Sequence, residues 1–341
     1  MTIATIGIDI AKNVFHLHGV CVDGNVVVSR QLRRRQDIPY LQQLTPCLIG
    51  IEACPGAHHW ARQISALDHE VRLMPPQYVK PYVKRQKNDA ADAAAICEAV
   101  TRPTMRFVAV KSAEQQSVLM LHRTRELFVR QKTMLINALR AQLGEFGIAA
   151  PQGRTGLAQL LRDVGAAETQ LPSLAREAML LLIGQLREAT SRLAAVEQQI
   201  LKWHRSSTVS RRRESIPGVG PITASVIAAS VIDGRQFQNG RQFAAWLGLV
   251  PRQCSTGGKA RLGRITKWGD SYIRKLLVVS PCSLIRYARG KSAAENWLAN
   301  ILKRRPAKIA AVAMANKTAR IIWAVLTQER EYQKRVTVLA T

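Results

Sequence analysis

The sequence has little of three things: aromatic residues, acidic residues and closely spaced cysteines. Aromatic residues make up 5% of the 341 residues, and the 23 acidic residues are fewer than half of the 50 lysines and arginines. None of the six cysteines forms a CxxC pair, which gives no indication of a zinc site or a disulfide framework and is typical of a reduced, cytosolic protein. The shortage of acids leaves a formal net charge of +27.

Long apolar segments and export signals are also missing from the pattern. No apolar run reaches the roughly 18 residues that a membrane span requires, and the N-terminal TIATIGIDIAK lacks the features of a signal peptide. We therefore expect a cytoplasmic protein and no membrane partner. The isoelectric point near 10.8 instead indicates nucleic acid as the partner.

The positive charge is unevenly distributed along a chain that is long enough for two domains and connecting helices. Residues 1–100 contain 11 basic and 9 acidic residues, a net charge of +2, whereas residues 101–341 carry +25. Candidate catalytic acids and candidate phosphate-binding cations therefore lie in different parts of the chain. A small acidic cluster in so basic a protein is what metal-dependent cleavage of nucleic acid requires.

The first hundred residues predict a layered α/β domain. Alternation and turn residues predict strands at 2–10, 15–22, 25–32, 47–53 and 70–75, and helices at 37–43, 57–69 and 89–100. This order is typical of a ribonuclease H-like sheet. In such a sheet, Asp9 on the first strand and Glu52 at the end of the fourth would lie side by side at the centre.

A second pair of acids begins the helix predicted at 89–100. Asn88 can cap this helix, and Asp89 and Asp92 are spaced i, i+3, so both project from one helical face. Together with Asp9 and Glu52 they could hold Mg²⁺ or Mn²⁺. The alternative interpretation is that Asp89 only favours the positive end of the helix dipole and that Asp92 is solvated.

Two long helices are predicted in the middle of the chain. Apolar residues recur at helical spacing from about Ser112 to Phe146 and from Ser173 to Trp203. A stretch containing Gly and Pro, residues 147–172, joins them, so they could form an antiparallel coiled-coil arm used for oligomerisation. The alternative, an ordinary helical hairpin within one chain, fits the same pattern.

The third region contains two motifs suited to phosphate. SIPGVGPITASVIAAS is typical of a helix-hairpin-helix, in which Gly218 and Gly220 would let backbone N–H groups approach a DNA phosphate. The alternative for PGVGP is merely a tight turn.

Further on, a Ser-Thr-Gly-Gly loop resembles a phosphate cradle. The cations around it are Arg252, Lys259, Arg261, Arg264 and Lys267. They could neutralise a phosphate and stabilise a departing oxyanion, which would make Ser255 a nucleophile. The alternative is a solvated basic turn with an unreactive hydroxyl.

These motifs, in this order, resemble the transposases of the insertion-sequence one-ten family, especially its eleven-eleven subgroup. The segments that carry the resemblance are GIDIAK, IEACPG, KNDAAD, SIPGVGPITA and GLVPRQCSTGGKARLGRITKWGD, which together span nearly the whole chain. The resemblance implies a RuvC-like domain over residues 1–110, a coiled-coil connection over 111–205 and a mostly helical transposase domain over 206–335. The DEDD tetrad of the family corresponds to Asp9, Glu52, Asp89 and Asp92.

The resemblance further implies RNA-guided recombination. A structured noncoding RNA encoded by the element, the bridge or seek RNA, would pair with double-stranded target and donor DNA. A serine would attack a DNA phosphate to give a phosphoserine and a free 3′-hydroxyl, with Mg²⁺ or Mn²⁺ on the tetrad, in a homo-oligomer from dimer to tetramer. Some relatives place the serine directly before the glycine, where this chain has Thr256, so Thr256 remains the alternative nucleophile to Ser255.

Two other functions fit parts of the pattern. A metal-only, junction-resolving nuclease of the RuvC type would use the same tetrad with water as the nucleophile. A non-enzymatic nucleic-acid-binding regulator would retain only the fold. His16 and His18 alternate onto one strand face without acids or cysteines at metal spacing, so we interpret both as structural.

Overall fold

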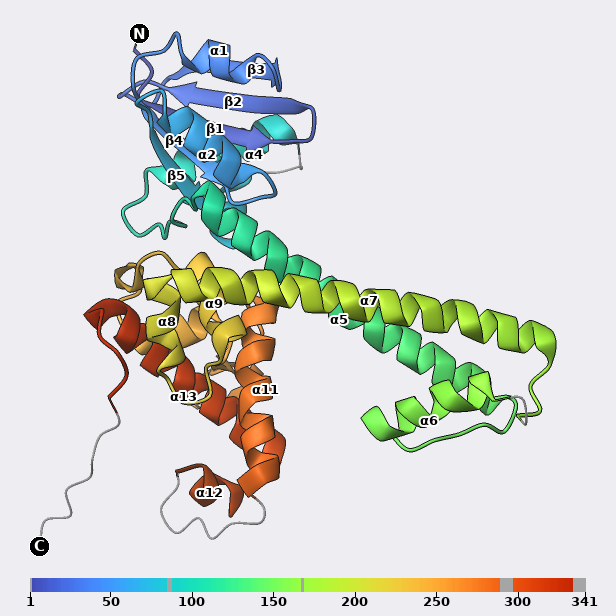
Figure 1. Ribbon diagram of the computed structural model, residues 1–341. Helices are drawn as coiled ribbons and strands as arrows, with labels where there is room; N and C mark the ends of the chain where they lie inside the picture. The colour runs from blue at the N-terminus through green and yellow to red at the C-terminus, as the bar shows by residue number, and fades with distance from the viewer. Residues whose placement is uncertain (1, 85–87, 167–168, 260, 289–296, 334–341) are drawn as a thin grey trace, which may run out of the picture. The chain divides into compact units, whose positions relative to one another are not determined.

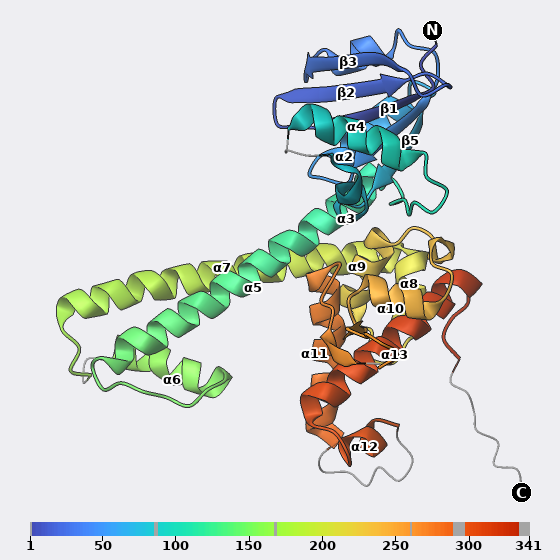
Figure 2. The same ribbon diagram turned by 180° about the vertical axis from the view of Figure 1, so that it is seen from behind.

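The computed structural model describes residues 2–84, 88–166, 169–259, 261–288 and 297–333, and its ribbon is drawn in Figures 1 and 2. The contacts within the chain divide it into two compact units, residues 1–116 and 117–341. The first unit is mixed α/β, and the second is mostly helical. The limit predicted for the third region, residue 335, lies outside the described residues.

A five-stranded mixed sheet forms the centre of the first unit. Its strands lie in the order β3 (Val26–Arg33), β2 (Val14–Val20), β1 (Thr5–Ile10), β4 (Leu48–Glu52) and β5 (Glu70–Met74). The strands β1, β2 and β3 pair antiparallel, whereas β4 lies parallel to both β1 and β5. The five predicted strands are thereby confirmed, and the sheet is consistent with a ribonuclease H-like fold.

Strand alternation determines what each face of this sheet packs against. On one face, Ile8 and Phe15 are buried beneath α1 (Asp37–Leu41) and α2 (Ala57–Ser65), and the ring of Phe15 meets that of Trp60 edge-on at 4.8 Å. The other face is covered by α4 (Asp89–Val100), which is drawn in front of the sheet in Figure 2. A short helix, α3 (Pro76–Val79), and a 3₁₀ turn, η1 (Lys80–Tyr82), follow β5.

Two glycines let α4 lie close against the sheet. A Cβ atom added at Gly7 would lie 2.2 Å from the carbonyl oxygen of Ala93, and one added at Gly50 would lie 2.8 Å from the Cβ of Val100. No residue with a side chain would fit at either position without a shift of the backbone. The close approach therefore fixes the middle and the end of α4 relative to β1 and β4.

The second unit begins with the two long helices that the sequence predicts. These are α5 (Ala113–Gly144), which starts just before the boundary between the units, and α7 (Ser173–Ser206). The segment between them, predicted as a linker, contains a further helix, α6 (Arg154–Gly165). The three helices share a buried cluster of Leu139, Leu143, Leu160, Val164, Leu171, Met179, Ile183 and Leu186.

The rest of the second unit packs around a core formed by several short helices and two longer ones. In chain order the elements are α8 (Thr208–Glu214), α9 (Pro221–Ser230), η2 (Gly234–Gln236), α10 (Gly240–Trp246), the hairpin β6 (Pro251–Gln253) and β7 (Leu262–Ile265), α11 (Ser271–Ala288), α12 (Trp297–Leu302) and α13 (Ala307–Gln328). Phe243, Ile273 and Ile322 are fully buried in this core.

The helix α13 corrects the expectation that no apolar segment is long enough to span a membrane. By length and composition alone it could do so, because it has 22 residues and contains an 18-residue stretch with a mean hydropathy of 1.4. Lys308, Lys317 and Arg320 interrupt its sequence, which hides the overall hydropathy from a search for uninterrupted apolar runs. In this structure the helix buries Ala319 and Ile322 in the core of the second unit.

Candidate active site

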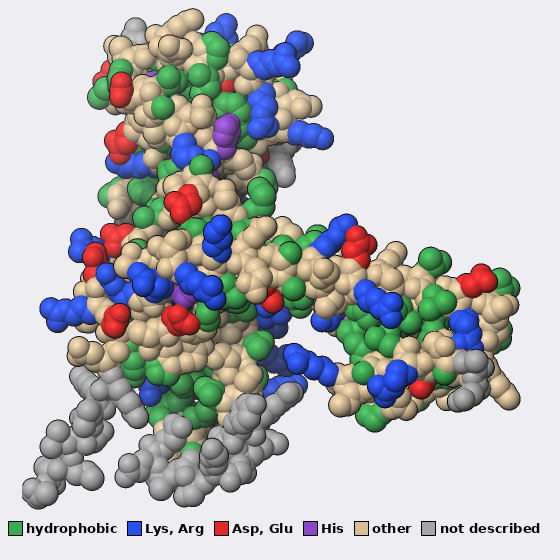
Figure 3. Space-filling model, viewed as in Figure 1, with side chains coloured by type: hydrophobic (Ala, Val, Ile, Leu, Met, Phe, Trp, Pro, Cys, Tyr) green, Lys and Arg blue, Asp and Glu red, His purple; other side chains and the backbone are tan. Residues whose placement is uncertain are grey.

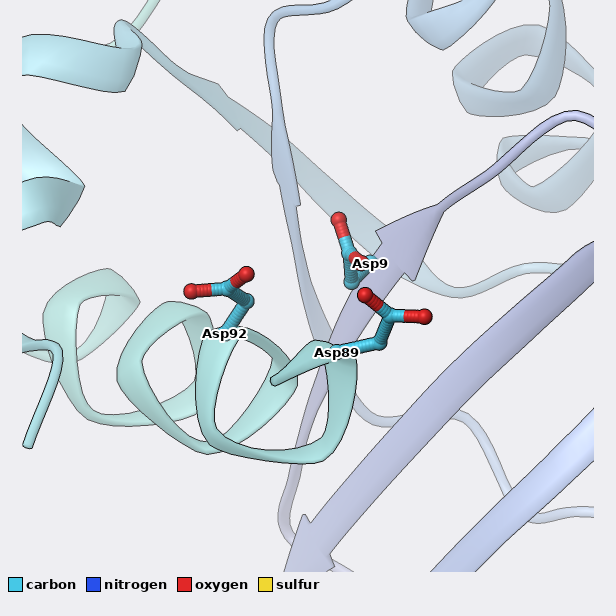
Figure 4. Close-up of side chains that lie close together, drawn as sticks. All are labelled: Asp9, Asp89 and Asp92. Atoms are coloured by element: carbon cyan, nitrogen blue, oxygen red, sulfur yellow. The ribbon is translucent and has the colours of Figure 1, made fainter. Parts of the chain in front are cut away.

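Three of the four predicted acids meet at one point of the first unit. Asp9, Asp89 and Asp92 each contribute a carboxylate oxygen, and these oxygens lie within 4.8 Å of one another. Asp9 projects from the end of β1, and the other two project from the first turn of α4 (Figure 4). Asp9 and Asp92 are half-buried, whereas Asp89 is exposed.

Glu52 lies outside this group of three oxygens but ends the neighbouring strand. In the parallel pairing of β1 with β4, Ile8 is opposite Ile51, so Asp9 and Glu52 are the next residues on adjacent strands. Because side chains alternate along a strand, both point to the face that carries α4. Burial and then the charges of Glu52 and Asp9 raise the pKa of the Cys54 thiol, so both carboxylates lie near this sulfur.

The start of α4 is fixed by a side-chain cap. The Oδ1 atom of Asn88 accepts a hydrogen bond from the backbone N–H of Ala91 at 2.7 Å, which confirms the predicted cap. The partial positive charge at a helix N-terminus stabilises nearby carboxylates, so it partly offsets the repulsion between Asp89 and Asp92. The helix end thus holds the two acids toward Asp9.

The donor atoms of the cluster fit a hard divalent cation. Mg²⁺ and Mn²⁺ prefer carboxylate oxygens, and Mg²⁺ is usually held by one or two carboxylates together with oxygens of a phosphate substrate. Asp9, Asp89 and Asp92 offer oxygens only, and two of them are half-buried. A cation at this point would relieve the repulsion that three converging carboxylates create.

His16 is a neighbour of the cluster that the sequence interpretation missed. It lies opposite Asp9 in the pairing of β1 with β2, and its Nε2 atom is 3.4 Å from the Oδ2 atom of Asp89. The sequence interpretation found no acid at metal-ligand spacing from His16 along the chain. It is wrong about the folded protein, because folding brings Asp89 next to His16. The available signal was the strand alternation, which places His16 and His18 on one face.

In the second unit, the serine loop connects β6 with β7, and its hydroxyls are exposed. The Oγ atom of Ser255 accepts hydrogen bonds from Nε2 of Gln253 at 3.1 Å and from the backbone N–H of Arg261 at 3.3 Å. Gly257 and Gly258 follow with φ angles of +55° and +75°, a conformation that favours glycine. Both donors hold the hydroxyl oxygen of Ser255 in place.

The five cations predicted around this loop are all exposed. They lie on the β6–β7 hairpin or directly after it and are Arg252, Lys259, Arg261, Arg264 and Lys267. Within the described ranges, none of the five forms an ion pair with an acid. Lysine and arginine side chains also lie over both units on the face drawn in Figure 3. Positive charge without counterions is suited to attract phosphate.

The predicted helix-hairpin-helix segment, residues 215–230, forms a glycine turn and the helix α9, and the helix before the turn, α8, ends just ahead of the segment. The turn lies between α8 and α9, and Gly218 adopts a φ angle of +83°. The carbonyl oxygen of Gly218 accepts a hydrogen bond from Oγ of Ser280 at 2.6 Å, so α11 braces the turn. Gly220 precedes α9, and a Cβ added there would meet no atom within 4 Å. Its contact with DNA stays a prediction.

Comparison with known proteins gives matches in both units. A model of the transposase family IS116/IS110/IS902 matches residues 210–295, and a model of the DEDD transposase of IS110 elements matches residues 6–148. The first of these segments contains Ser255, and the second contains all four predicted acids.

Relatives extend the similarity over nearly the whole chain. A protein of Pseudomonas aeruginosa named "Probable family 20 transposase" is 50% identical over 98% of this chain and 99% of its own length. The transposase for insertion sequence element IS1328 of Yersinia enterocolitica is 38% identical over 97% of this chain and 99% of its own length. The transposase for IS1111A of Coxiella burnetii is also 38% identical, over 97% of this chain and 92% of its own length.

Proposed function

Because the chain belongs to the IS116/IS110/IS902 family of transposases, we propose that it cleaves and rejoins DNA to move an insertion sequence. One observation carries the proposal: carboxylate oxygens of Asp9, Asp89 and Asp92 converge to within 4.8 Å at the end of β1 and the start of α4. Such a cluster in a protein of net charge +27 combines a cation site with attraction for phosphates.

The acids have the first role in this mechanism. Asp9, Asp89 and Asp92, with Glu52 beside Asp9 at the end of the next strand, would hold Mg²⁺ or Mn²⁺. When bound, the cation would stabilise negative charge on the reacting phosphate oxygens. The chain contributes the positions: Asn88 fixes the helix end, and His16 lies against the carboxylate of Asp89 at 3.4 Å.

Ser255 has the second role, as the nucleophile. Its Oγ atom forms a bond to a DNA phosphorus while the bond from phosphorus to the 3′ oxygen breaks, and the serine proton ends on that oxygen. The products are a phosphoserine and a free 3′-hydroxyl. The hydrogen bonds from Gln253 and Arg261 orient Oγ, and the exposed guanidinium groups of Arg252 and Arg264 stabilise the phosphate charge. Thr256 is the alternative, but its β-branched hydroxyl is more hindered.

The choice of DNA sites and the assembly complete the proposal. A structured noncoding RNA of the element would pair with target and donor DNA, so base pairing would supply the sequence specificity. The protein would act as a dimer or tetramer. The net charge of +25 over residues 101–341 supports binding of more than one nucleic acid. Sequencing the RNA that copurifies with the protein tests the guide.

The nucleophile can be tested with DNA that traps the intermediate. A nicked suicide substrate is incubated with protein and Mg²⁺, and a denaturing gel detects any covalent protein–DNA product. We expect this product with the wild type and with Thr256→Ala, and its loss with Ser255→Ala. Loss with Thr256→Ala alone would move the role to Thr256. Cleaved DNA without a covalent product from any of the three proteins would instead indicate the metal-only nuclease.

A further inference from the structure

A groove of about 1750 Å³ runs along α13 in the second unit. The start of α10 and the β6–β7 hairpin form its walls. Two features hold the walls to α13. Nδ2 of Asn316 donates a hydrogen bond to the carbonyl oxygen of Leu249 at 3.1 Å. Gly240 packs closely against the backbone of α13, because a Cβ added to it would lie only 3.2 Å from the Cα of Arg320. Backbone packing therefore maintains the groove.

The charged side chains in this groove are all of one sign. Among its described lining residues, none is acidic and six are basic: Arg241, Arg264, Lys267, Lys308, Lys317 and Arg320. None of the six is ion-paired within the parts of the chain that the structure describes. Because like charges held together without counterions repel one another, the groove attracts a ligand that carries several negative charges.

The floor of the groove is apolar. Ile309, Val312 and Ala313 of α13 line it, and Ile309 remains 53% exposed. At 3.6 residues per turn, Ile309 and Ala313 lie on the side of α13 opposite the core position Ile322, and Val312 lies between the two sides. The apolar residues of α13 therefore have two uses: one side packs in the core, and the other lines the groove. An apolar strip bordered by cations is unexpected on a surface that contacts only water.

We propose that this groove binds a single-stranded segment of nucleic acid, with phosphates on the cations and bases on the apolar floor. A single strand carries one negative charge per nucleotide and exposes the faces of its bases. A double helix offers the same phosphates but keeps its base faces stacked inside, so it cannot use the floor. The inference rests on the proposed function, because strand exchange and guide pairing both require unpaired segments.

Binding measured by fluorescence anisotropy tests the cationic rim. The probes are labelled oligo(dT), oligo(U) and a DNA duplex, each of about twelve nucleotides per strand, in buffer with a chelator so that no cleavage occurs. The variant combines Lys308→Glu with Arg320→Glu. Its matched control combines Lys202→Glu with Arg205→Glu, two exposed cations of α7 that do not line the groove.

We expect the groove variant to weaken single-strand binding by about tenfold or more and to reduce the slope of log Kd against log salt by about 1 to 2. The control should change affinity by less than about threefold, because charge removed outside the site acts only at long range. Tighter binding of oligo(dT) or of oligo(U) would assign the strand to DNA or to RNA. Equal losses in the two double variants would overturn the proposal.

A second variant tests the apolar floor. Ile309→Ser removes an exposed apolar side chain and no charge, so we expect it to reduce the preference for single strand over duplex and to leave the salt slope unchanged. An unchanged preference would contradict the role of the floor.

Loss of polyglutamate binding in the rim variant, with oligonucleotide binding retained, would assign the groove to an acidic protein instead. Since every measurement is made without metal, a failure of DNA cleavage would not affect these results.

Discussion

Asp9, Asp89 and Asp92 owe their proximity to residues that carry no charge. Gly7 lets α4 approach β1, and the side chain of Asn88 fixes where that helix begins. The three acids then converge because each is carried by backbone that packing has already placed. At this scale, the uncharged neighbours determine the geometry and the acids determine the chemistry.

Asp37 is an acidic residue outside the cluster, and unlike the three clustered acids it is fully buried. Neither of its carboxylate oxygens accepts a hydrogen bond from the described residues. Burial raises the pKa of Asp37 to about 7 from its ordinary value of 3.8. Between these two values the folded protein keeps a proton that the unfolded chain has lost. The contribution of Asp37 to stability therefore falls as the pH rises from about 4 to about 7.

Replacing Asp37 with Asn should remove this dependence. We expect Asp37→Asn to be more stable than the wild type by about 2 kcal/mol at pH 8, and to show a much smaller difference at pH 5. Urea unfolding at the two pH values measures both quantities. Asp23→Asn, at an exposed turn, is the control and should show no such change. A difference between Asp37→Asn and the wild type that does not depend on pH would contradict the assignment.

The acids of the site could be read from the sequence, whereas their neighbours could not. Asp9 and Glu52 end predicted strands and Asp89 and Asp92 share a helical face, so local patterns placed all four. The contact of His16 with Asp89 depends on strand register and on the packing of α4 against the sheet, and neither is a local property. The same limit applies to the two donors that hold the Ser255 hydroxyl.

At the scale of elements, the packing of α4 on the sheet is the feature on which the cluster depends. Gly7→Ala would place a Cβ 2.2 Å from the carbonyl oxygen of Ala93, so the helix must move. We expect a loss of stability of about 1 to 3 kcal/mol and weaker metal binding, because Asp9 and Asp89 separate. Urea unfolding and Mn²⁺ titration measure these two effects.

Gly184 provides the matched control for this substitution. It lies within α7, and a Cβ added there would meet no atom within 4 Å. Gly184→Ala should therefore stabilise the protein by about 0.5 to 1 kcal/mol, because alanine is the better helix former. If Gly7→Ala and Gly184→Ala changed stability equally, close packing of α4 would not be the cause.

Long or strongly patterned elements were predictable, and short elements between breakers were not. The helices α5 and α7 follow from apolar periodicity alone. The helix α6 escaped prediction because Gly153 and Gly165 bracket it and Pro151 precedes it, which together are typical of a linker. Its Leu160 and Val164 complete a small core that becomes visible only once α5 and α7 are packed beside it.

At the scale of the whole molecule, the long helix α7 carries apolar side chains that the packing within the second unit does not cover. On α7, Leu174 is 79% exposed and Leu181 is 74% exposed. Exposed leucines on a long helix are suited to packing against another copy of the chain. They support the predicted oligomerisation role of the long helices α5 and α7.

The substitution Leu181→Glu should weaken such an assembly. We expect multi-angle light scattering to show a dimer or tetramer for the wild type and a shift toward the monomer for Leu181→Glu, because a buried charge without a partner is costly. Val22→Glu is the control, since Val22 is 88% exposed in the turn between β2 and β3. A wild type that is monomeric at all concentrations would contradict the oligomeric arm.

Calorimetric titration of Mn²⁺ into the protein tests the central claim, that the convergent carboxylates form a cation site. The wild type is compared with Asp92→Asn and with the control Glu98→Gln. Glu98 is an acid of the same helix, α4, but it pairs with Arg102 and is not part of the cluster. We predict saturable binding to the wild type and to Glu98→Gln, and affinity lower by about tenfold or more for Asp92→Asn. Equal affinity of Asp92→Asn and Glu98→Gln, or no saturable binding to the wild type, would contradict the account.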